Sequence, residues 1–381
     1  MVETYDYIIC GAGASGLLLA YRMANDPFFD NKHILLLDKD PKNTNDRTWC
    51  YWEEGKGEWD ALLYNQWDLA FFGSASFKKT FDLDPYRYKM LRGIDFYTFI
   101  LKSIEGHRNI TFKIEEVKEF VDNNDGVTVE TTHATYTARH VFNSLFRPHK
   151  LQQQEKYPLL QQHFIGWFIK TPKPVFDAET VTFMDFSIPQ KGNTRFMYVL
   201  PISENEALLE YTLFSADLLP KNEYEAGILA YIQELGIKEY EITAKEDGNI
   251  PMSCFPFEEG NTKNLLHIGT AGGWTKASTG FTFLKTSRKT KEVIEFLKKG
   301  KPLDQFHKRN KFWYYDLLFI DVLYRDNARG ASLFSEMFKK RSPKKIFRFL
   351  DEQSNFIEDL SVMFSLVGKG FERALFKRLF K

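Results

Sequence analysis

The fold is decided by residues 5–16, which read YDYIICGAGASG. Residues 5–10 are typical of a short buried strand, and this strand leads straight into a glycine turn. Residues 17–24 (LLLAYRMA) follow as an apolar helix, and residues 33–37 (HILLL) follow as a second buried strand. A strand, a glycine turn, a helix and a second strand in this order form the βαβ unit of a parallel sheet. The sequence therefore predicts an α/β fold that begins with this unit.

The glycine turn has the pattern Gly-x-Gly-x-x-Gly, which is typical of dinucleotide-binding loops. Gly11 permits the tight turn, Gly13 lets the backbone approach a pyrophosphate, and Gly16 allows the helix and strand to pack closely. The helix offers free N–H groups and its positive dipole end to phosphates. Asp38 ends the second strand, where its carboxylate can accept hydrogen bonds from ribose hydroxyls. A turn with a purely structural role is the alternative. The residues expected to bind the cofactor here are Gly11, Gly13, Ala14, Ser15, Gly16 and Asp38.

A second glycine-rich turn follows a late buried strand, at residues 267–273 (HIGTAGG). Gly269 lies in this turn, and Gly280 comes shortly before the helix expected at residues 286–298. The first loop alone does not distinguish FAD from NAD. The second turn favours FAD, because the ribityl chain and isoalloxazine of this elongated cofactor must be held far from the first loop. A flexible loop that binds no ligand is the alternative.

A change of pattern after residue 150 indicates further structural units. Residues 181–186, 195–200 and 207–214 read as three short strands joined by polar turns, which predicts an antiparallel sheet. After Pro302 the pattern is helical to the last residue. We expect a discontinuous dinucleotide-binding domain at residues 1–150 and 255–300, an antiparallel-sheet substrate domain at residues 151–254, and a helical C-terminal region at residues 301–381.

The composition argues against several classes of function. Lys and Arg number 51 and Asp and Glu number 51, so no net charge favours nucleic acid as a partner. The cysteines have no paired spacing, which argues against a disulfide framework and a metal site and suits a reducing cytosol. The longest apolar run, residues 312–324, is broken by Asp316 and Asp321, so no membrane-spanning helix is expected. The three cysteines are Cys10, Cys50 and Cys254.

Several motifs occur in the order and spacing of one known family. The sequence resembles the flavin-dependent lycopene cyclases, in the bacterial branch that makes β-ionone rings, from residue 5 to roughly residue 360. It departs from the family at Asp46, where Asn is common, at Thr270, where related flavin enzymes have an acid, and at Tyr211, where a paired motif has its second acid. The motifs are DRTW at 46–49, MD at 184–185, RFMYVLP at 195–201, LEYT at 209–212 and STGF at 278–281.

The resemblance implies a fold and a reaction. The fold is an FAD-binding Rossmann-like domain of the GR2-type flavoproteins, with an antiparallel-sheet substrate domain and a helical C-terminal region. The reaction closes the linear ends of lycopene into rings, through γ-carotene to β-carotene, with no net oxidation. It requires reduced FAD, and NAD(P)H supplies the reduction. An acid protonates the end-group alkene, the neighbouring double bond closes the ring, and loss of a proton restores an alkene.

The resemblance also assigns roles to individual residues. Glu210 is the expected acid, because alternation places it with Leu208 and Thr212 on one mostly apolar face, where burial would keep its carboxyl protonated. A solvated carboxylate on an edge strand is the alternative. Asp185, which shares a face with Val181 in this pattern, is expected to assist or orient, although a structural acid is equally compatible. The family motifs and nearby cations add Arg47, Thr48, Arg92, Thr279 and Gly280 as cofactor contacts; ordinary surface arginines are the alternative for Arg47 and Arg92.

The C-terminal segment is basic and aromatic. Residues 337–381 carry 11 Lys and Arg and 5 Asp and Glu, and residues 370–381 interleave aromatic and basic side chains. A basic amphipathic helix can lie on an anionic membrane surface, and a packed surface helix has the same pattern. Because lycopene resides in membranes, we expect a cytoplasmic protein bound peripherally to the cytoplasmic membrane. Other functions left open are an FAD/NAD(P)H-dependent oxidoreductase, such as a hydroxylase or isoprenoid reductase, and a non-catalytic carotenoid carrier.

Overall fold

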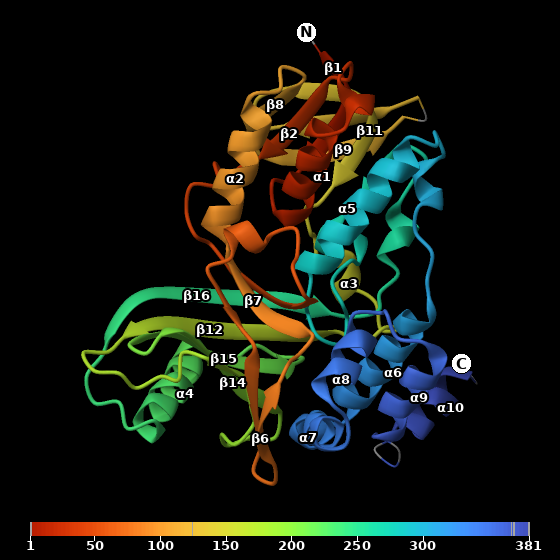
Figure 1. The fold of residues 1–381 in the computed structure, drawn as a ribbon. Coiled ribbons are helices and arrows are strands. Elements are labelled where there is room, and N and C mark those ends of the chain that lie inside the picture. Colours follow the sequence, from red (N-terminus) through yellow and green to blue (C-terminus); the bar gives the residue numbers. More distant parts are fainter. Residues whose placement is uncertain (1, 124, 367, 369, 380–381) are drawn as a thin grey trace.

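The computed structural model describes residues 2–379 except residues 124, 367 and 369, and it contains two large sheets and a C-terminal group of helices (Figure 1). The first sheet has the order β8-β2-β1-β11-β10-β9, with β17 beside β11. Its centre is parallel: β1 pairs with β2 and β11, and β2 pairs with β8. Its strands are β1 (Glu3–Cys10), β2 (Ile34–Asp38), β8 (Ile110–Ile114), β9 (Val117–Asp122), β10 (Val127–Thr131), β11 (Thr135–Asn143) and β17 (Leu265–His267).

Helices pack on the first sheet, and their apolar side chains bury those of its central strands. The helix α1 (Ala14–Ala24) follows β1 directly and packs against α2 (Gly93–Glu105) and α5 (Phe283–Leu297). The middle of α1 is fully buried, as the apolar run in the sequence indicates. The βαβ unit predicted from residues 5–38 is therefore confirmed.

The second sheet is predominantly antiparallel and has the order β16-β12-β15-β14-β13-β5-β6. One face carries α4 (Lys221–Glu234), and the other faces the main cavity and the C-terminal helices. A third, smaller sheet has three strands in the order β3-β7-β4. The strands concerned are β3 (Thr48–Glu54), β4 (Asn65–Trp67), β5 (Leu69–Gly73), β6 (Lys78–Asp82), β7 (Tyr86–Arg92), β12 (Leu160–Lys170), β13 (Thr180–Asp185), β14 (Thr194–Ser203), β15 (Glu206–Ser215) and β16 (Glu241–Met252).

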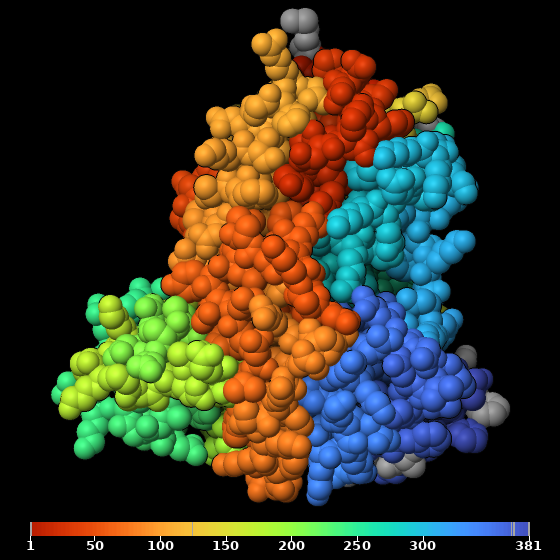
Figure 2. All heavy atoms as spheres, in the orientation of Figure 1, coloured from red at the N-terminus to blue at the C-terminus, as the bar shows by residue number. Residues whose placement is uncertain are grey.

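Two strands of the second sheet come from the early part of the chain. β5 pairs in parallel with β13, and β6 pairs with β5, although residues 69–82 lie within the stretch assigned above to the dinucleotide-binding domain. Figure 2 shows this early segment (orange) running between the second sheet (green) and the C-terminal helices (blue). Residues 69–82 therefore belong to the second sheet, although the sequence pattern grouped them with the dinucleotide-binding domain. Pairing with a distant strand leaves no pattern in the local sequence that could have indicated this.

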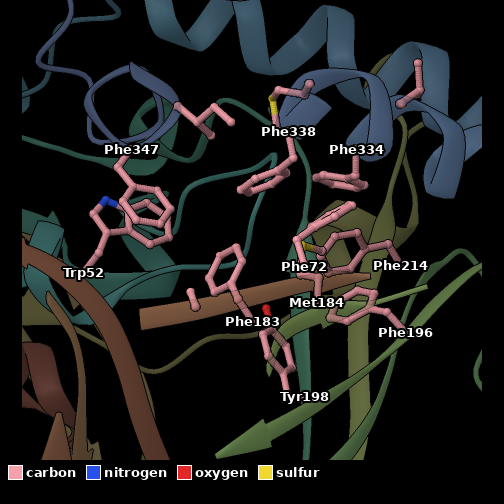
Figure 3. Packing of buried hydrophobic residues seen from close by; sticks show 14 of the residues in the cluster. Trp52, Phe72, Phe183, Met184, Phe196, Tyr198, Phe214, Phe334, Phe338 and Phe347 are labelled. Atoms are coloured by element: carbon pink, nitrogen blue, oxygen red, sulfur yellow. The ribbon is translucent and has the colours of Figure 1, made fainter. Parts of the chain in front are cut away.

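The C-terminal region is helical, as predicted, and packs onto the second sheet through aromatic side chains. Phe338 of α7 stacks on Phe72 at 4.5 Å between ring centroids, and Phe347 of α8 stacks on Trp52 at 4.6 Å (Figure 3). Within the described residues, no helix is both long and apolar enough to cross a membrane. The helices are α6 (Lys311–Arg325), α7 (Gly330–Lys340), α8 (Pro343–Leu350), α9 (Phe356–Phe364) and α10 (Phe371–Leu379); a short helix, α3 (His149–Gln152), precedes β12.

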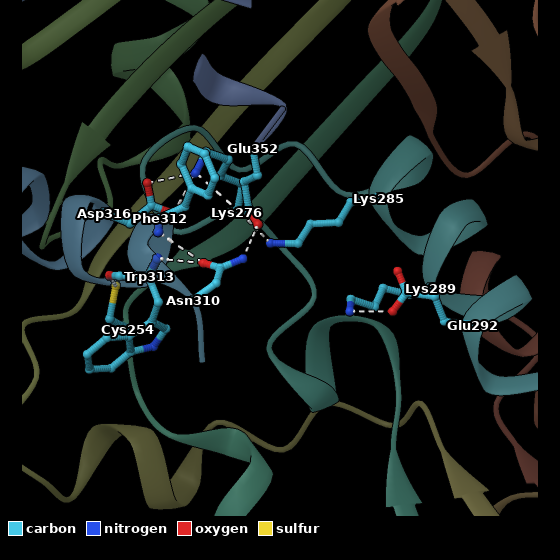
Figure 4. A network of polar contacts seen from close by, with 10 residues as sticks. All are labelled: Cys254, Lys276, Lys285, Lys289, Glu292, Asn310, Phe312, Trp313, Asp316 and Glu352. Atoms are coloured by element: carbon cyan, nitrogen blue, oxygen red, sulfur yellow. Dashed lines mark hydrogen bonds and ion pairs between the residues drawn. The ribbon is translucent and has the colours of Figure 1, made fainter. Parts of the chain in front are cut away.

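A buried ionic network fastens this helical region to the second glycine-rich segment (Figure 4). The Lys276 Nζ lies 2.8 Å from both carboxylate oxygens of Asp316 on α6 and 3.5 Å from Glu352. Glu352 also accepts from Lys285 of α5 at 2.7 Å. Since Lys276 and Asp316 are both almost fully buried, their charges depend on one another for compensation.

Candidate active site

The first glycine loop has the geometry that its pattern requires. Gly11 has φ +99°, which favours glycine. A Cβ on Gly16 would lie 1.9 Å from the carbonyl oxygen of Gly11, so only glycine lets α1 come this close to the loop. A Cβ on Gly13 would meet nothing within 4 Å, and the N-terminus of α1 has no side-chain cap. The loop therefore leaves open space and free N–H groups where a phosphate would lie.

Asp38 lies directly beside this loop. One carboxylate oxygen accepts from the Ala12 N–H at 2.5 Å, the other accepts from the Asp40 N–H at 2.9 Å, and the Lys42 Nζ lies 3.8 Å away. The carboxylate thus fixes the end of β2 against the glycine loop, and its remaining lone pairs are available to a ribose.

The second glycine turn approaches the first loop closely. Gly269 has φ +60°, and a Cβ there would lie 2.4 Å from the Ser15 hydroxyl oxygen. Gly280 has φ +74°, and a Cβ there would lie 2.0 Å from the Gln162 side-chain oxygen. Gly269 thus lies against the first loop and not far from it, whereas Gly280 lies against β12 of the second sheet.

Both turns open onto a cavity of about 560 Å³ that also reaches the second sheet. The described residues that line this cavity do not include Gly11, Gly16 or Asp38. The expected site residues that do line it are Gly13, Ala14, Ser15, Arg47, Thr48, Glu210, Gly269, Thr279 and Gly280.

Arg92 lies elsewhere, on the far side of β3 and β7. Its guanidinium donates to both carboxylate oxygens of Asp95 at 2.7 and 3.0 Å and stacks 4.0 Å above the ring of Tyr64. Its donors are engaged there, and Arg92 is not among the described residues lining the cavity. Arg47 does line the cavity and pairs with Asp46 at 2.9 Å.

Asp185 is also turned away from this cavity. It accepts from the Tyr231 hydroxyl of α4 at 2.9 Å and from the Ser187 N–H at 2.9 Å. The sequence pattern placed Asp185 on one face with Val181, but the pairing of β13 shifts register between Thr182 and Asp185. That irregularity adds a residue to the strand and reverses the side on which later side chains point. The prediction that Asp185 and Val181 share a face is therefore wrong. Asp185 packs beneath α4 as a hydrogen-bonded acid.

Glu210 is buried on the cavity face of β15. Leu208 belongs to the core beneath the C-terminal helices, whereas Leu209 and Tyr211 pack under α4, so the predicted alternation is confirmed. The Thr212 hydroxyl donates to Glu210 at 2.6 Å. Burial, reinforced by the charge of a neighbouring glutamate, raises the pKa of Glu210 well above that of an ordinary carboxyl.

That neighbouring glutamate is Glu246 on β16, which sequence analysis missed. β12 lies between β15 and β16, and Gly166 of β12 is in register with both Glu210 and Glu246. A Cβ on Gly166 would lie 3.2 Å from the Glu246 Cγ and 3.6 Å from the Glu210 Cβ. Two carboxyl groups thus share one end of the cavity across a position without a side chain.

Glu246 is held by a residue that the sequence assigned to the cofactor. The Thr48 hydroxyl donates to its carboxylate at 2.7 Å. Burial raises the pKa of Glu246, while this hydrogen bond from Thr48 lowers it. Residues 241–252 (EITAKEDGNIPM) are mostly polar, so no apolar alternation marked them as a strand or Glu246 as partly buried.

Other groups in the cavity are polar and have no partner within the chain. The Gln162 side-chain oxygen and the hydroxyls of Thr279 and Thr286 are buried without a hydrogen bond among the described residues. All three residues line the cavity. Because buried polar groups are nearly always paired, these atoms mark positions where a bound polar ligand would complete their hydrogen bonds.

A second, apolar cavity of about 240 Å³ lies among α6, α7, α8, α9 and α10. It shares Thr279 with the main cavity and is lined chiefly by Phe, Leu and Met side chains, including Phe319, Phe334 and Met337. Phe364, at its rim, is 64% exposed. The two cavities therefore adjoin at Thr279.

Comparisons with known proteins agree with this arrangement. A family model described as "Lycopene cyclase protein" matches residues 6–376. Among curated proteins, no sequence matches significantly.

Solved structures share the fold at low sequence identity. A geranylgeranyl bacteriochlorophyll reductase-like protein from Thermoplasma acidophilum is 12% identical with a TM-score of 0.60, and the match covers 97% of each chain. A flavoprotein/dehydrogenase from Cytophaga hutchinsonii is 14% identical with a TM-score of 0.60, covering 96% of this chain and 100% of that one. A flavin-dependent brominase is 13% identical with a TM-score of 0.56, covering 95% and 93%. The predicted flavoprotein-type α/β fold is thus confirmed.

Proposed function

The chain belongs to the lycopene cyclase family, and on this premise we propose that it is a lycopene β-cyclase that converts lycopene through γ-carotene into β-carotene. The observation that carries the proposal is the buried carboxyl of Glu210 in the cavity that the glycine loop also lines. A carboxyl with a raised pKa keeps its proton near neutral pH and can donate it to an alkene. Alkene protonation is the step that starts ring closure.

The residues of the main cavity fit FAD. The open space at Gly13 and the uncapped start of α1 suit a pyrophosphate, and Asp38 suits a ribose. Arg47, Gly269, Thr279 and Gly280 lie where the rest of an elongated cofactor would run. When bound and reduced by NAD(P)H, FAD supplies negative charge near the developing cation without being consumed. The two hydrogen bonds from Arg92 to Asp95 favour a structural role for Arg92 outside the cavity.

The surroundings of Glu210 suit a hydrocarbon cation. Tyr198 is its cross-strand neighbour, and Tyr88 and Phe164 line the same cavity. Aromatic faces attract a cation, and an apolar wall excludes water that would otherwise trap the cation as an alcohol. Asp185 supports this wall indirectly, through its hydrogen bond with Tyr231 of α4.

The apolar cavity among the C-terminal helices supports a membrane-derived substrate. It is too apolar for a polar ligand, and its rim lies near exposed apolar side chains of α9 and α10, among them Phe356, Ile357 and Leu379. Basic side chains are interleaved with the apolar ones of α10 in the sequence, whereas Glu358 and Asp359 follow Phe356 and Ile357 in α9. We infer that this surface rests on an anionic membrane and that the polyene passes from there toward Thr279.

The test is an anaerobic incubation of the purified protein with lycopene in liposomes and chemically reduced FAD. Chromatographic appearance of γ-carotene and β-carotene, without matching loss of reduced flavin, is the expected result. Loss of reduced flavin in proportion to a hydrogenated or hydroxylated product would instead identify an oxidoreductase. A protein that binds lycopene but leaves it unchanged, and whose function is undiminished in the Glu210→Gln variant, would instead be a carrier.

A further inference from the structure

The function proposed above assigns a role to only one acid, Glu210. The carboxyl of Glu246 nevertheless lines the same main cavity as Glu210. The two residues lie on the strands that flank β12, both in register with Gly166. We propose that Glu246 is the base that removes the final proton from the ring cation, so that the two glutamates divide the acid and base steps. This inference rests on the cyclase function proposed above and adds a catalytic residue to it.

Protons and electrons balance in this division. The O–H bond of Glu210 breaks as a C–H bond forms at the terminal alkene, and the neighbouring double bond then attacks the cation and closes the ring. A C–H bond beside the ring cation breaks, its electrons become the ring alkene, and its proton passes to the Glu246 carboxylate. Return of one proton from Glu246 to Glu210, directly or through water, restores the pair. No oxidant or reductant is consumed.

Surroundings decide which glutamate is the acid. Glu210 is only 8% exposed and lies among apolar side chains, so its neutral form is favoured. Burial also raises the pKa of Glu246, but only to about 7, because Glu246 is less buried than Glu210 and the Thr48 hydroxyl donates to its carboxylate. Each negative charge also disfavours the other, so the pair readily holds a single proton. A protonated Glu210 beside an ionised Glu246 is the state that can begin the reaction.

Gly166 gives this pair its geometry. A side chain at this position would stand between the two carboxyl groups, since even a Cβ would come within 3.2 Å of Glu246. With glycine, the space over β12 is left to the Leu208 side chain, whose Cδ1 would lie 2.9 Å from such a Cβ, while Glu210 and Glu246 both line the cavity where a ring could contact them. The added proton and the removed proton belong to different carbons of the end group, so two fixed groups serve better than one carboxyl that must move.

A second observation points to a ligand in the cavity that this pair lines. The buried oxygens of Gln162 and Thr279 lack partners among the described residues and line the same cavity. Other titratable groups near the pair are Cys50, Tyr88 and Tyr198, and burial raises the pKa of each, so these three groups stay neutral near pH 7. Asp247, which also lines the cavity, adds a negative charge that raises the pKa of Glu246.

The test compares Glu246→Gln, Glu246→Asp and the control Glu241→Gln, which alters an exposed residue of the same strand. Cyclisation rates are measured against pH with lycopene liposomes and reduced FAD, and FAD affinity is measured separately. A rate that rises with pH as Glu246 ionises and falls as Glu210 ionises is expected for the wild-type protein. Glu246→Gln should lower kcat about 100- to 10,000-fold and abolish the rising limb, with unchanged FAD affinity.

The remaining falling limb of Glu246→Gln should move to lower pH, because the charge that opposed ionisation of Glu210 is gone. Glu246→Asp should keep the rising limb and recover part of the rate, and Glu241→Gln should match the wild-type protein. Full activity of Glu246→Gln with an intact rising limb would overturn the inference and make Glu210 both acid and base. Weakened FAD binding, with full kcat at saturating FAD, would overturn it in favour of a cofactor contact. A wild-type protein that cyclises no lycopene would instead refute the proposed function.

Discussion

Three influences set the pKa of the Glu210 carboxyl: burial and the charge of Glu246 raise it, and the hydrogen bond from Thr212 lowers it. We expect Glu210→Gln to lower the cyclisation rate at least about 100-fold, because the amide cannot supply the proton that starts ring closure. Gln fits the same space and can still accept from Thr212, so FAD affinity should be unchanged. Chromatographic assay of γ-carotene and β-carotene measures the effect, and a variant that keeps more than a tenth of the activity would exclude Glu210 as the acid.

The same residue makes stability depend on pH. The pKa of Glu210 is higher in the folded protein than in the unfolded chain, so the folded state holds its proton longer as pH rises. This contribution to the free energy of unfolding is fully present at low pH and is lost as pH rises toward the folded pKa. Glu210→Gln should therefore become progressively more stable than the wild-type protein between about pH 5 and pH 9. Urea unfolding at several pH values tests this, and parallel curves for the two proteins would contradict it.

Gly16 offers a test of the cofactor loop. Gly16→Ala should weaken FAD binding at least about tenfold, because the new Cβ would collide with the Gly11 carbonyl oxygen and push α1 away from the loop. Gly106→Ala is a matched control, since a Cβ there meets nothing within 4 Å and φ is −75°. Fluorescence titration with FAD measures both variants. Equal affinities would show that the close approach of α1 to the loop is not needed for binding.

At the scale of elements, local patterns identified some site residues and missed others for physical reasons. The βαβ unit and the alternation of β15 could be predicted, because each element buries an apolar face that shows in its own sequence. Asp185 was placed on the wrong face, because a register shift in β13 is set by its partner strands. Glu246 was missed, because β16 is polar along its length and its position beside Glu210 depends on the pairing of three strands.

The contact between the second glycine segment and α6 depends on a buried ion pair. Lys276→Met should lower the free energy of unfolding by about 3–5 kcal/mol, because it leaves Asp316 with an uncompensated buried charge, whereas Glu352 keeps its ion pair with Lys285. The double variant Lys276→Met with Asp316→Leu should recover much of the loss, since an apolar pair carries no such penalty. Urea denaturation measures both. A double variant as unstable as the single one would assign the loss to packing rather than to charge.

At the scale of the whole molecule, the exposed apolar side chains of α9 predict where the protein meets a membrane. Phe356 and Ile357 are 63% and 78% exposed. Replacing both with Ser should reduce co-sedimentation with anionic liposomes at low salt, because it removes apolar area that would be buried in the interface. The control replaces Leu218 and Leu229, which are also exposed but lie near α4. A loss of binding that is equal in both variants, or absent in both, would place the membrane-facing surface elsewhere.

The arrangement of the three regions was only partly visible in the sequence. The βαβ unit, the antiparallel sheet and the helical C-terminus each carry a local pattern. The crossing of β5 and β6 into the second sheet, and the apolar cavity lined by the C-terminal helices α6 to α10, arise only when distant segments meet. The apolar cavity adjoins the cavity of the proposed chemistry at Thr279.

The measurement that tests acid-initiated cyclisation most directly is the mass of the product formed in D2O with reduced FAD under anaerobic conditions. Each ring closure should place one solvent-derived deuteron in the product and release one proton of the substrate, so β-carotene should carry one deuterium per ring while the reduced flavin is conserved. The Glu210→Gln variant should form almost none of this product. Unlabelled β-carotene, or a product that gains two hydrogens as reduced flavin is lost, would contradict protonation by Glu210 as the first step.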